Sequence, residues 1–171
     1  NPHSVMAIFE RRPQDVYEIQ CPEHDLSSEW QTVRQTAEEL GIPVTVSSLA
    51  RQGSKSQNKQ RRHAGAEAVI KEREPESLDA LIASPDPKGI WVGLDTVQDP
   101  HNVGSIFRSS AFFGISGLIT THDRNAPITY TVYDVASGGV EYVPFAIEIN
   151  LSRSIDRIKK AGIWILGTSE H

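Results

Sequence analysis

The part of this 171-residue chain that most constrains its fold is the stretch from residue 90 to residue 114. Residues 90–94 form an apolar run that is typical of a buried strand, and a polar loop follows them. From Val103 the apolar residues recur at the spacing of a helix that ends at Gly114. Asn102 is a favourable N-cap residue, so we expect the helix to begin there. The sequence therefore predicts a strand, a loop and a helix, with the loop at the carboxyl end of the strand.

This loop and the helix start form a candidate ligand site, because open α/β sheets bind ligands beyond the carboxyl ends of their strands. Gly104 and Arg108 are four residues apart and share one face of the helix. Gly104 leaves room for a close neighbour, and Arg108 stands one turn from free N–H groups that favour an anion. We expect a phosphate or ribose phosphate near Asn102 and Arg108. Plainer interpretations stay open: Asn102 can be cap and ligand or a cap alone, and a surface arginine is often only solvated.

The rest of the second half of the chain alternates strands with helices. Strands are predicted at residues 117–121, 143–149 and 163–166, with helices at about 128–137 and 151–161. Repeated alternation of this kind predicts an α/β fold with a parallel sheet.

Residues 1–84 are predicted to form a smaller α/β unit of their own. The expected elements are a short helix carrying Val5, Ile8 and Phe9 on one side, a strand at 16–21, a helix from Ser27 or Ser28, and a strand at 42–46. The inward face of the second helix is formed by Trp30, Val33, Ala37 and Leu40. A stretch rich in Pro and Gly, residues 85–89, is the predicted linker.

Charge is unevenly distributed along the chain, whose formal net charge is −5. A negative total argues mildly against binding to nucleic acid, since that affinity comes largely from neutralising phosphates. Residues 51–63 nevertheless carry several basic side chains and no acid, in a loop-like stretch. Such a loop can be merely solvated, but it can also contact RNA. The candidate RNA-binding residues are Arg51, Lys55, Lys59, Arg61, Arg62 and His63.

The residues around the predicted helix start carry a family resemblance. The block DPHNVG at residues 99–104, followed by Arg108, Ala111 and Gly114, resembles the first motif of the SpoU/TrmH family. Members of that family are S-adenosylmethionine-dependent RNA ribose 2′-O-methyltransferases of the SPOUT class. Residues 121–127 (THDRNAP) resemble the segment after the family's second strand, and residues 138–144 (GGVEYVP) resemble its small-residue turn. The resemblance implies a parallel-sheet SPOUT domain at residues 90–171, Rossmann-like and knotted when complete.

The resemblance extends more loosely to the N-terminal part. Residues 2–5 (PHSV) resemble the opening of the ribosomal-protein-like RNA-binding domain that precedes many catalytic domains of the family. Residues 63–65 (HAG) resemble its His-Gln-Gly turn, with Ala64 in place of glutamine. This implies an RNA substrate-binding domain at residues 1–84, joined by residues 85–89 to the methyltransferase domain. The family's C-terminal Gly/Glu and Ser-Leu-Asn motifs are not found, so that domain is expected to be C-terminally incomplete.

The function that the resemblance implies is 2′-O-methylation of ribose in structured rRNA or tRNA, often at guanosine, with S-adenosylmethionine as cofactor. It assigns activation of the hydroxyl to Arg108 and the first edge of the donor pocket to Gly167 and Thr168. Asn102 would either position the ribose or fix the side chain of Arg108. Because a guanidinium keeps its proton at neutral pH, we favour Arg108 as a cation that holds a phosphate and stabilises the developing alkoxide. Direct proton abstraction is the second choice. The resemblance also implies a homodimer when the chain is full length.

Two other functions stay open. A non-catalytic RNA-binding protein would keep the fold without the donor pocket, and a mononucleotide-binding α/β protein would use the helix start, although no P-loop or G-x-G-x-x-G is present. The histidines His24, His101 and His122 lack metal-ligand spacing, so no metal site is expected. The single cysteine, Cys21, fits a reducing compartment. With no apolar run of about 20 residues and no leader, we expect a cytoplasmic protein without a membrane partner.

Overall fold

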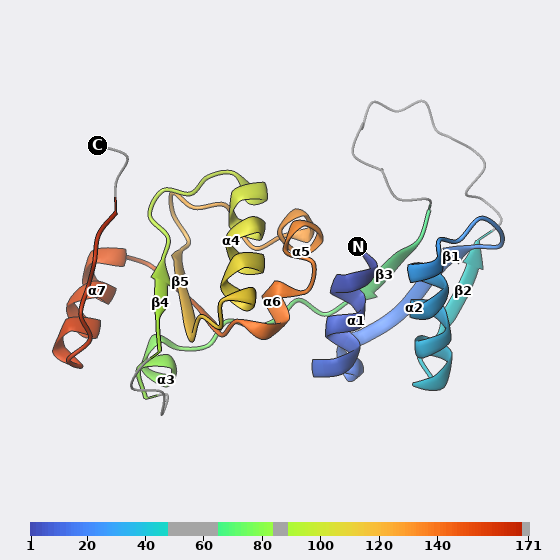
Figure 1. Ribbon diagram of the computed structural model, residues 1–171, viewed down its shortest axis with the longest axis horizontal. Helices are drawn as coiled ribbons and strands as arrows, with labels where there is room; N and C mark the ends of the chain where they lie inside the picture. Colours follow the sequence, from blue (N-terminus) through green and yellow to red (C-terminus); the bar gives the residue numbers. More distant parts are fainter. Residues whose placement is uncertain (48–64, 84–88, 169–171) are drawn as a thin grey trace. The chain divides into compact units, whose positions relative to one another are not determined.

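The computed structural model describes residues 1–47, 65–83 and 89–168 and divides the chain into two compact units (Figure 1). The first unit is Asn1–Arg73 and the second is Glu74–His171. Each unit has its own sheet and its own hydrophobic core, so each is described by itself.

The first unit is a small sheet with two longer helices. Its elements are α1 (Pro2–Arg11), the 3₁₀-helix η1 (Pro13–Asp15), β1 (Val16–Pro22), α2 (Ser28–Glu39), β2 (Val44–Ser47) and β3 (Glu67–Ile70). The sheet order is β2-β1-β3, with β1 and β2 parallel and β1 and β3 antiparallel. The mixed sheet and the helices agree with the predicted α/β unit, whereas its likeness to a ribosomal protein stays a prediction.

The core of the first unit comes from the predicted helix faces. Apolar side chains of α1 and α2 are buried together with those of β1, namely Val5, Ile8, Phe9, Val16, Ile19, Trp30, Val33 and Ala37. Leu40 was expected on the same face, but it is 47% exposed. The reason is that α2 ends at Glu39, so Leu40 is the C-cap residue and leaves the helical stripe.

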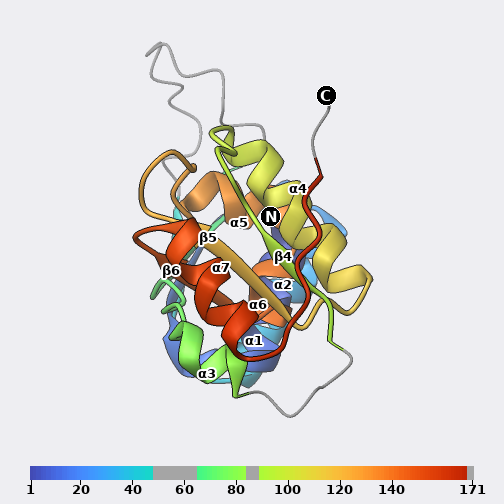
Figure 2. The same ribbon diagram turned by 90° about the vertical axis from the view of Figure 1, so that its left-hand side faces the viewer.

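The second unit is a parallel α/β unit, as the sequence predicts. Its elements are α3 (Leu78–Ile82), β4 (Trp91–Gly93), α4 (Pro100–Phe112), β5 (Gly117–Thr121), α5 (Tyr130–Ala136), α6 (Gly139–Tyr142), β6 (Phe145–Glu148) and α7 (Leu151–Lys160). The sheet order is β4-β5-β6, and both pairings are parallel. Helices α4, α5 and α6 lie on one side of these strands, and α3 and α7 lie on the other (Figures 1 and 2).

Both faces of this second sheet are packed. On the side of α4, the ring of Phe107 meets that of Phe145 edge to face, with 5.6 Å between the ring centroids. On the other side, Leu78, Leu81 and Ile158 pack with sheet residues Ile119 and Ala146. Parallel strands are normally covered on both faces in this way, because their helical crossovers lie on both sides.

The structure divides the chain earlier than the predicted boundary at residue 84. Helix α3 was assigned to the first domain, but its buried residues Leu78 and Leu81 belong to the core of the second unit. The backbone N–H of Glu76 also donates to the carbonyl of Phe145 on β6, at 2.8 Å. The Pro/Gly composition at residues 85–89 therefore does not mark the division, and residues 84–88 lie outside those that the structure describes.

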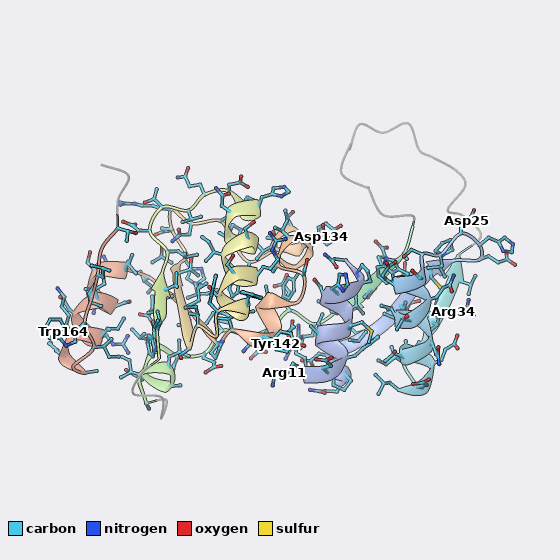
Figure 3. The ribbon with its side chains drawn as sticks, viewed as in Figure 1. Arg11, Asp25, Arg34, Asp134, Tyr142 and Trp164 are labelled. Carbon is cyan, nitrogen blue, oxygen red and sulfur yellow. The ribbon has the colours of Figure 1, made fainter. Side chains whose placement is uncertain are left out.

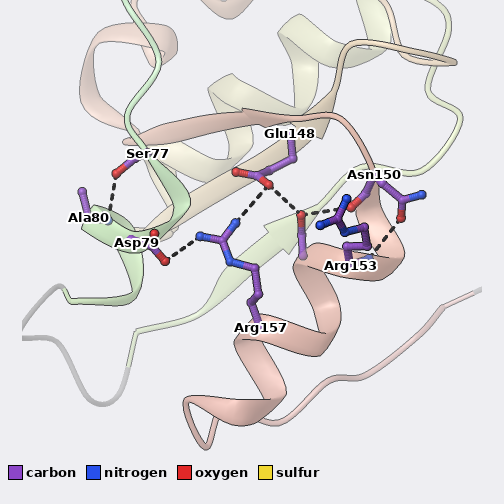
Figure 4. Close-up of polar contacts among 8 residues, drawn as sticks. Ser77, Asp79, Ala80, Glu148, Asn150, Arg153 and Arg157 are labelled. Atoms are coloured by element: carbon purple, nitrogen blue, oxygen red, sulfur yellow. Dashed lines mark hydrogen bonds and ion pairs between the residues drawn. The ribbon is translucent and has the colours of Figure 1, made fainter.

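Polar contacts also tie α3 to the second unit (Figure 4). The guanidinium of Arg157 on α7 contacts Asp79 Oδ1 at 2.5 Å and Glu148 Oε2 at 3.2 Å. The hydroxyl of Ser154 donates to the same Glu148 oxygen at 3.2 Å, and Asn150 caps α7 by accepting from the N–H of Arg153. Asp79 is largely exposed, so its ion pair adds little stability. Packing of the apolar residues contributes most of the stability that holds α3 in the second unit.

Two further expectations differ from the structure. Residues 163–166 were predicted to form a strand, but they have no regular secondary structure, and Trp164 is 97% exposed on the outside of the unit (Figure 3). A strand needs a hydrogen-bonded neighbour, and within the described residues this segment has none in the sheet. The small-residue turn at residues 138–144 contains a short helix, α6, that follows the left-handed residues Ser137 and Gly138.

Candidate functional site

The start of α4 lies at the carboxyl end of β4, where the sequence places the candidate site. The helix begins three residues earlier than expected: Asp99 is the N-cap, and its Oδ1 accepts a hydrogen bond from the N–H of His101 at 2.8 Å. Pro100 occupies the first helical position, where its fixed φ and missing N–H cost nothing. The prediction that Asn102 is the cap is therefore wrong, because the Asp99-Pro100 pair is the stronger start signal.

Because Asp99 is the cap, the side chain of Asn102 is available for another role. Asn102 is exposed in the first turn of α4, and among the described residues its side chain makes no hydrogen bond. It lines an open groove of about 540 Å³ beside α4, together with Val97, Ser105, Ser109 and Phe113. The groove is mostly apolar, with an amide and hydroxyls along one wall, which suits a ligand that has both polar and apolar surface.

Arg108 lies on another face of the same helix. Its side chain is exposed and has no hydrogen bond or ion pair within residues 1–47, 65–83 and 89–168. Asn102 and Arg108 are six residues apart, which is about 9 Å along a helix and about 240° around it. Arg108 is accordingly not part of the groove that Asn102 lines. A ligand that contacts both residues would therefore have to extend around α4 from its first turn to a point past its midpoint.

Small residues let α5 and α6 approach α4 closely. A Cβ atom placed on Gly104 would stand 2.8 Å from Val135 Cβ and 2.9 Å from the carbonyl oxygen of Val132, both on α5. A Cβ atom on Gly139 of α6 would stand 2.7 Å from the carbonyl oxygen of Phe107 and 2.8 Å from the backbone nitrogen of Arg108. The expectation that Gly104 leaves room for a neighbour is confirmed, and the backbone at Arg108 is held by α6.

Asn125, which the sequence analysis did not identify as a site residue, joins the loops that follow β4 and β5. The side-chain amide of Asn125 is buried and donates to the carbonyl of Leu94 at 3.2 Å and to Thr121 Oγ1 at 2.8 Å. Its Oδ1 accepts from the N–H of Val97 at 2.7 Å. A turn-prone Asn after a predicted strand was the available signal, but only the fold shows that its partners lie on the preceding loop.

Of the other predicted site residues, the structure describes only Gly167 and Thr168. Gly167 and Thr168 are exposed and lie in no helix or strand, and beyond its chain neighbours no atom lies within 4 Å of a Cβ placed on Gly167. The predicted RNA-binding residues all fall at positions 51–63, outside the described part of the chain. Among the described residues, no group of His, Cys, Asp and Glu has the arrangement of a metal site.

The same residues contain no helix long and apolar enough to cross a membrane.

A parallel α/β unit with a polar loop and a helix start beyond its strand ends is an arrangement typical of α/β proteins that bind a ligand at that edge. Comparison with known proteins identifies a family within this class of protein. Residues 89–171 match the model of the SpoU rRNA Methylase family. The chain belongs to this SpoU/TrmH family of RNA methyltransferases.

Individual relatives agree with this membership. The chain is 32% identical over 170 residues to the 23S rRNA (guanosine-2′-O-)-methyltransferase RlmB of Coxiella burnetii, covering 98% of this chain and 67% of the relative. It is 38% identical over 109 residues to RlmB of Nitrosomonas europaea, covering 63% of this chain and 42% of that protein.

The fold agrees as well. The crystal structure of the SpoU methyltransferase AviRb from Streptomyces viridochromogenes, in complex with the cofactor AdoMet, matches with a TM-score of 0.65 and 18% identity. The match covers 94% of this chain and 56% of AviRb. The chain thus spans about two thirds of RlmB of Coxiella burnetii and just over half of this solved structure.

The N-cap correction leads to a test that separates capping from ligand binding at the helix start. Asp99→Ala is expected to lower the free energy of unfolding by about 1 kcal/mol, because it leaves an N–H group of α4 without its acceptor. Asn102→Ala is expected to change stability by less than about 0.5 kcal/mol, as is usual for an exposed side chain. Urea unfolding of both variants measures the difference. Equal losses would mean that Asn102 is the working cap after all.

Proposed function

We propose that this chain carries the ribose-activating part of an S-adenosylmethionine-dependent 2′-O-methyltransferase that acts on ribosomal RNA. The observation that supports this best is that two polar side chains of α4, Asn102 in its first turn and Arg108 further along, have no partner within the described residues. The names of the RlmB relatives favour guanosine in 23S rRNA as the target. Transfer RNA is the alternative substrate.

The reaction sets what these side chains have to do. In the proposed reaction the donor would supply its methyl group to the ribose 2′-oxygen, the carbon–sulfur bond of the sulfonium would break, and the hydroxyl proton would pass to water. Negative charge develops on the 2′-oxygen as the proton leaves, so a fixed cation nearby lowers the barrier. Arg108 supplies that cation and can hold an adjacent phosphate with its planar fork. Asn102 supplies a donor and an acceptor that orient the ribose.

The described residues fit only one edge of a methyl-donor site. Bound donor would supply the electrophilic methyl group, but Gly167 and Thr168 are exposed and have no enclosing wall among the residues described. A cofactor pocket normally buries most of its ligand. The roles proposed for this chain's own residues therefore concern the RNA ribose and phosphate.

The proposal also covers the function of the first unit, the oligomeric state and the cellular compartment. Asn1–Arg73 is proposed to bind the RNA substrate, with the basic residues at positions 51–62 contacting phosphates. The complete protein is proposed to act as a homodimer in the cytoplasm, and the free, buried thiol of Cys21 is compatible with a reducing compartment there.

Calorimetric titration of S-adenosylmethionine tests the donor site. The titration uses the 171-residue chain and, beside it, the complete gene product. We expect binding by the complete gene product and none by the 171-residue chain, because the described residues enclose no donor. Binding by the shorter chain would show that the donor pocket lies elsewhere, for example in the groove that Asn102 lines.

A second candidate function is a non-catalytic RNA-binding protein, which the exposed and unenclosed Gly167–Thr168 segment favours. Incubation of the complete gene product with radiolabelled donor and ribosomal RNA distinguishes the two. Label recovered as 2′-O-methylguanosine supports the enzyme. RNA binding without donor binding or label transfer supports the second candidate and overturns the first.

A further inference from the structure

We propose that Asn125 is a positioning residue that clamps the loop between β4 and α4 and so holds the start of α4 in the arrangement that meets the RNA ribose. The inference rests on the proposed function, because it assigns Asn125 to the same site. Asn125 itself is buried, and every partner of its side chain is a protein atom, so it acts through the loop rather than on the substrate.

The clamp joins two loops that are far apart in the sequence. Asn125 follows β5, whereas Leu94 and Val97 follow β4, 31 and 28 residues earlier. A backbone bond supports the same junction, since the N–H of Ala126 donates to the carbonyl of Val97 at 2.8 Å. The N–H of Val97 thus donates to the Asn125 side chain, and the carbonyl of Val97 accepts from the N–H of Ala126. Two residues further along, Asp99 begins α4, so the clamp fixes the segment that leads directly into the helix.

An asparagine side chain suits this position because it has a donor end and an acceptor end. Its amide nitrogen donates to Leu94 and Thr121, and its oxygen accepts from Val97. An aspartate has the same shape, but its ionised carboxylate can only accept hydrogen bonds. It would face the carbonyl oxygen of Leu94, another acceptor. Replacement of Asn125 by Asp therefore removes the donor function and leaves the size of the side chain almost unchanged.

Backbone conformation supports the need for a clamp. Thr96 and Arg124 have positive φ angles of 61° and 66°, although neither is glycine. They directly precede Val97 and Asn125, the two residues joined by the 2.7 Å hydrogen bond. Left-handed conformations at such residues persist only where surrounding contacts enforce them, and they gather at functional sites. The Asn125 hydrogen bonds are contacts that can enforce both conformations.

The main test is methylation of ribosomal RNA by the complete gene product carrying Asn125→Asp. The assay runs at 25 °C, after circular dichroism has shown that the variant is folded at that temperature. We expect kcat to fall by about 10- to 100-fold with little change in the KM for RNA, because a small displacement of a catalytic group affects the transition state most. The matched control is Asn150→Asp. Asn150 is also an asparagine in the second unit, and aspartate there can still cap α7.

Amide hydrogen exchange measures the clamp without any activity. In Asn125→Asp the carboxylate can still accept from Val97, but its repulsion from the carbonyl of Leu94 is expected to separate the two loops. Exchange at the N–H of Val97 and the N–H of Ala126 is therefore expected to accelerate at least 10-fold, with no such change in Asn150→Asp. Thr121→Val is a second variant, in case Asn125→Asp does not fold, and it removes the hydroxyl that accepts from Asn125 at 2.8 Å and also donates to the carbonyl of Asp123 at 2.6 Å. It is expected to lower kcat by about 3- to 10-fold, since the bonds to Leu94 and Val97 remain.

The results separate the inference from the function on which it rests. A wild-type protein that transfers no methyl group to RNA overturns the proposed function, and hydrogen exchange then decides whether the clamp exists. An active wild-type protein with unchanged kcat in both variants overturns the positioning role. Reduced activity that follows only a lower fraction of folded protein, with unchanged exchange at Val97, also overturns it.

Discussion

Arg108→Lys is expected to lower the kcat of RNA ribose methylation by about 100-fold or more and to leave the fold intact. Removal of a preorganised group that stabilises developing negative charge costs about 10²–10³ in kcat in well-studied enzymes. Lysine keeps the positive charge, but it replaces a planar fork with a flexible point charge that cannot hold a phosphate with two parallel hydrogen bonds. Arg108→Ala is expected to lose at least as much activity.

The structure explains why this loss should not reflect unfolding. The side chain of Arg108 is exposed and has no hydrogen bond or ion pair with the described residues, so the fold does not depend on it. Exposed substitutions of this kind usually change stability by less than about 0.5 kcal/mol. The neighbouring Phe107, in contrast, is fully buried against Phe145, so the two adjacent positions serve opposite purposes.

The measurement is single-turnover methylation of ribosomal RNA, which reports the chemical step apart from product release. Arg153→Lys is the matched control, because Arg153 is an exposed arginine on α7 of the same unit. Its rate is expected to equal that of the wild type. Turnover of Arg108→Lys within about threefold of the wild type would remove Arg108 from the catalytic role and would favour Asn102 alone as the functional residue of α4.

How far the sequence predicts this fold depends on whether the signal is local. The strand at residues 117–121 has the bounds that its apolar run predicts, because a buried strand carries its own signature. The parallel sheet of the second unit follows from strand–helix alternation and is confirmed. The first unit is confirmed only as α/β, since nothing in its helix and strand pattern is specific to a ribosomal protein.

The predictions that were wrong also have physical reasons. Residues 163–166 are as apolar as a strand, but apolar composition cannot provide the neighbouring strand that hydrogen bonding requires. At the start of α4 the sequence analysis considered Asn102 as the cap, whereas Asp99 is the cap and Pro100 occupies the first helical position, which proline favours. The Asn125 clamp depends on contacts across 28 to 31 residues, which no periodicity within one segment reports.

Gly139→Ala is expected to destabilise the second unit by about 1–3 kcal/mol, and the sign of the change is the informative part. Two effects oppose each other. Alanine is the better helix former, by up to about 1 kcal/mol at an unconstrained helical position. The added Cβ, however, would stand 2.7 Å from the carbonyl oxygen of Phe107 and 2.8 Å from the backbone nitrogen of Arg108. These are backbone atoms of a neighbouring helix, so neither can move aside as the end of a flexible side chain would.

Thermal unfolding of Gly139→Ala measures which effect prevails. For a unit of about this size, each 1 kcal/mol lowers Tm by about 4–8 °C. Gly93→Ala is the control, because its Cβ would meet only the end of the Leu151 side chain at 3.8 Å, an ordinary contact. Destabilisation should also displace α6 from the backbone that carries Arg108, so methyl transfer should fall at temperatures where Gly139→Ala is still folded. A Tm equal to or above that of the wild type would show that α6 does not hold α4 at Arg108, and the support proposed for the catalytic arginine would have to come from α5 through Gly104.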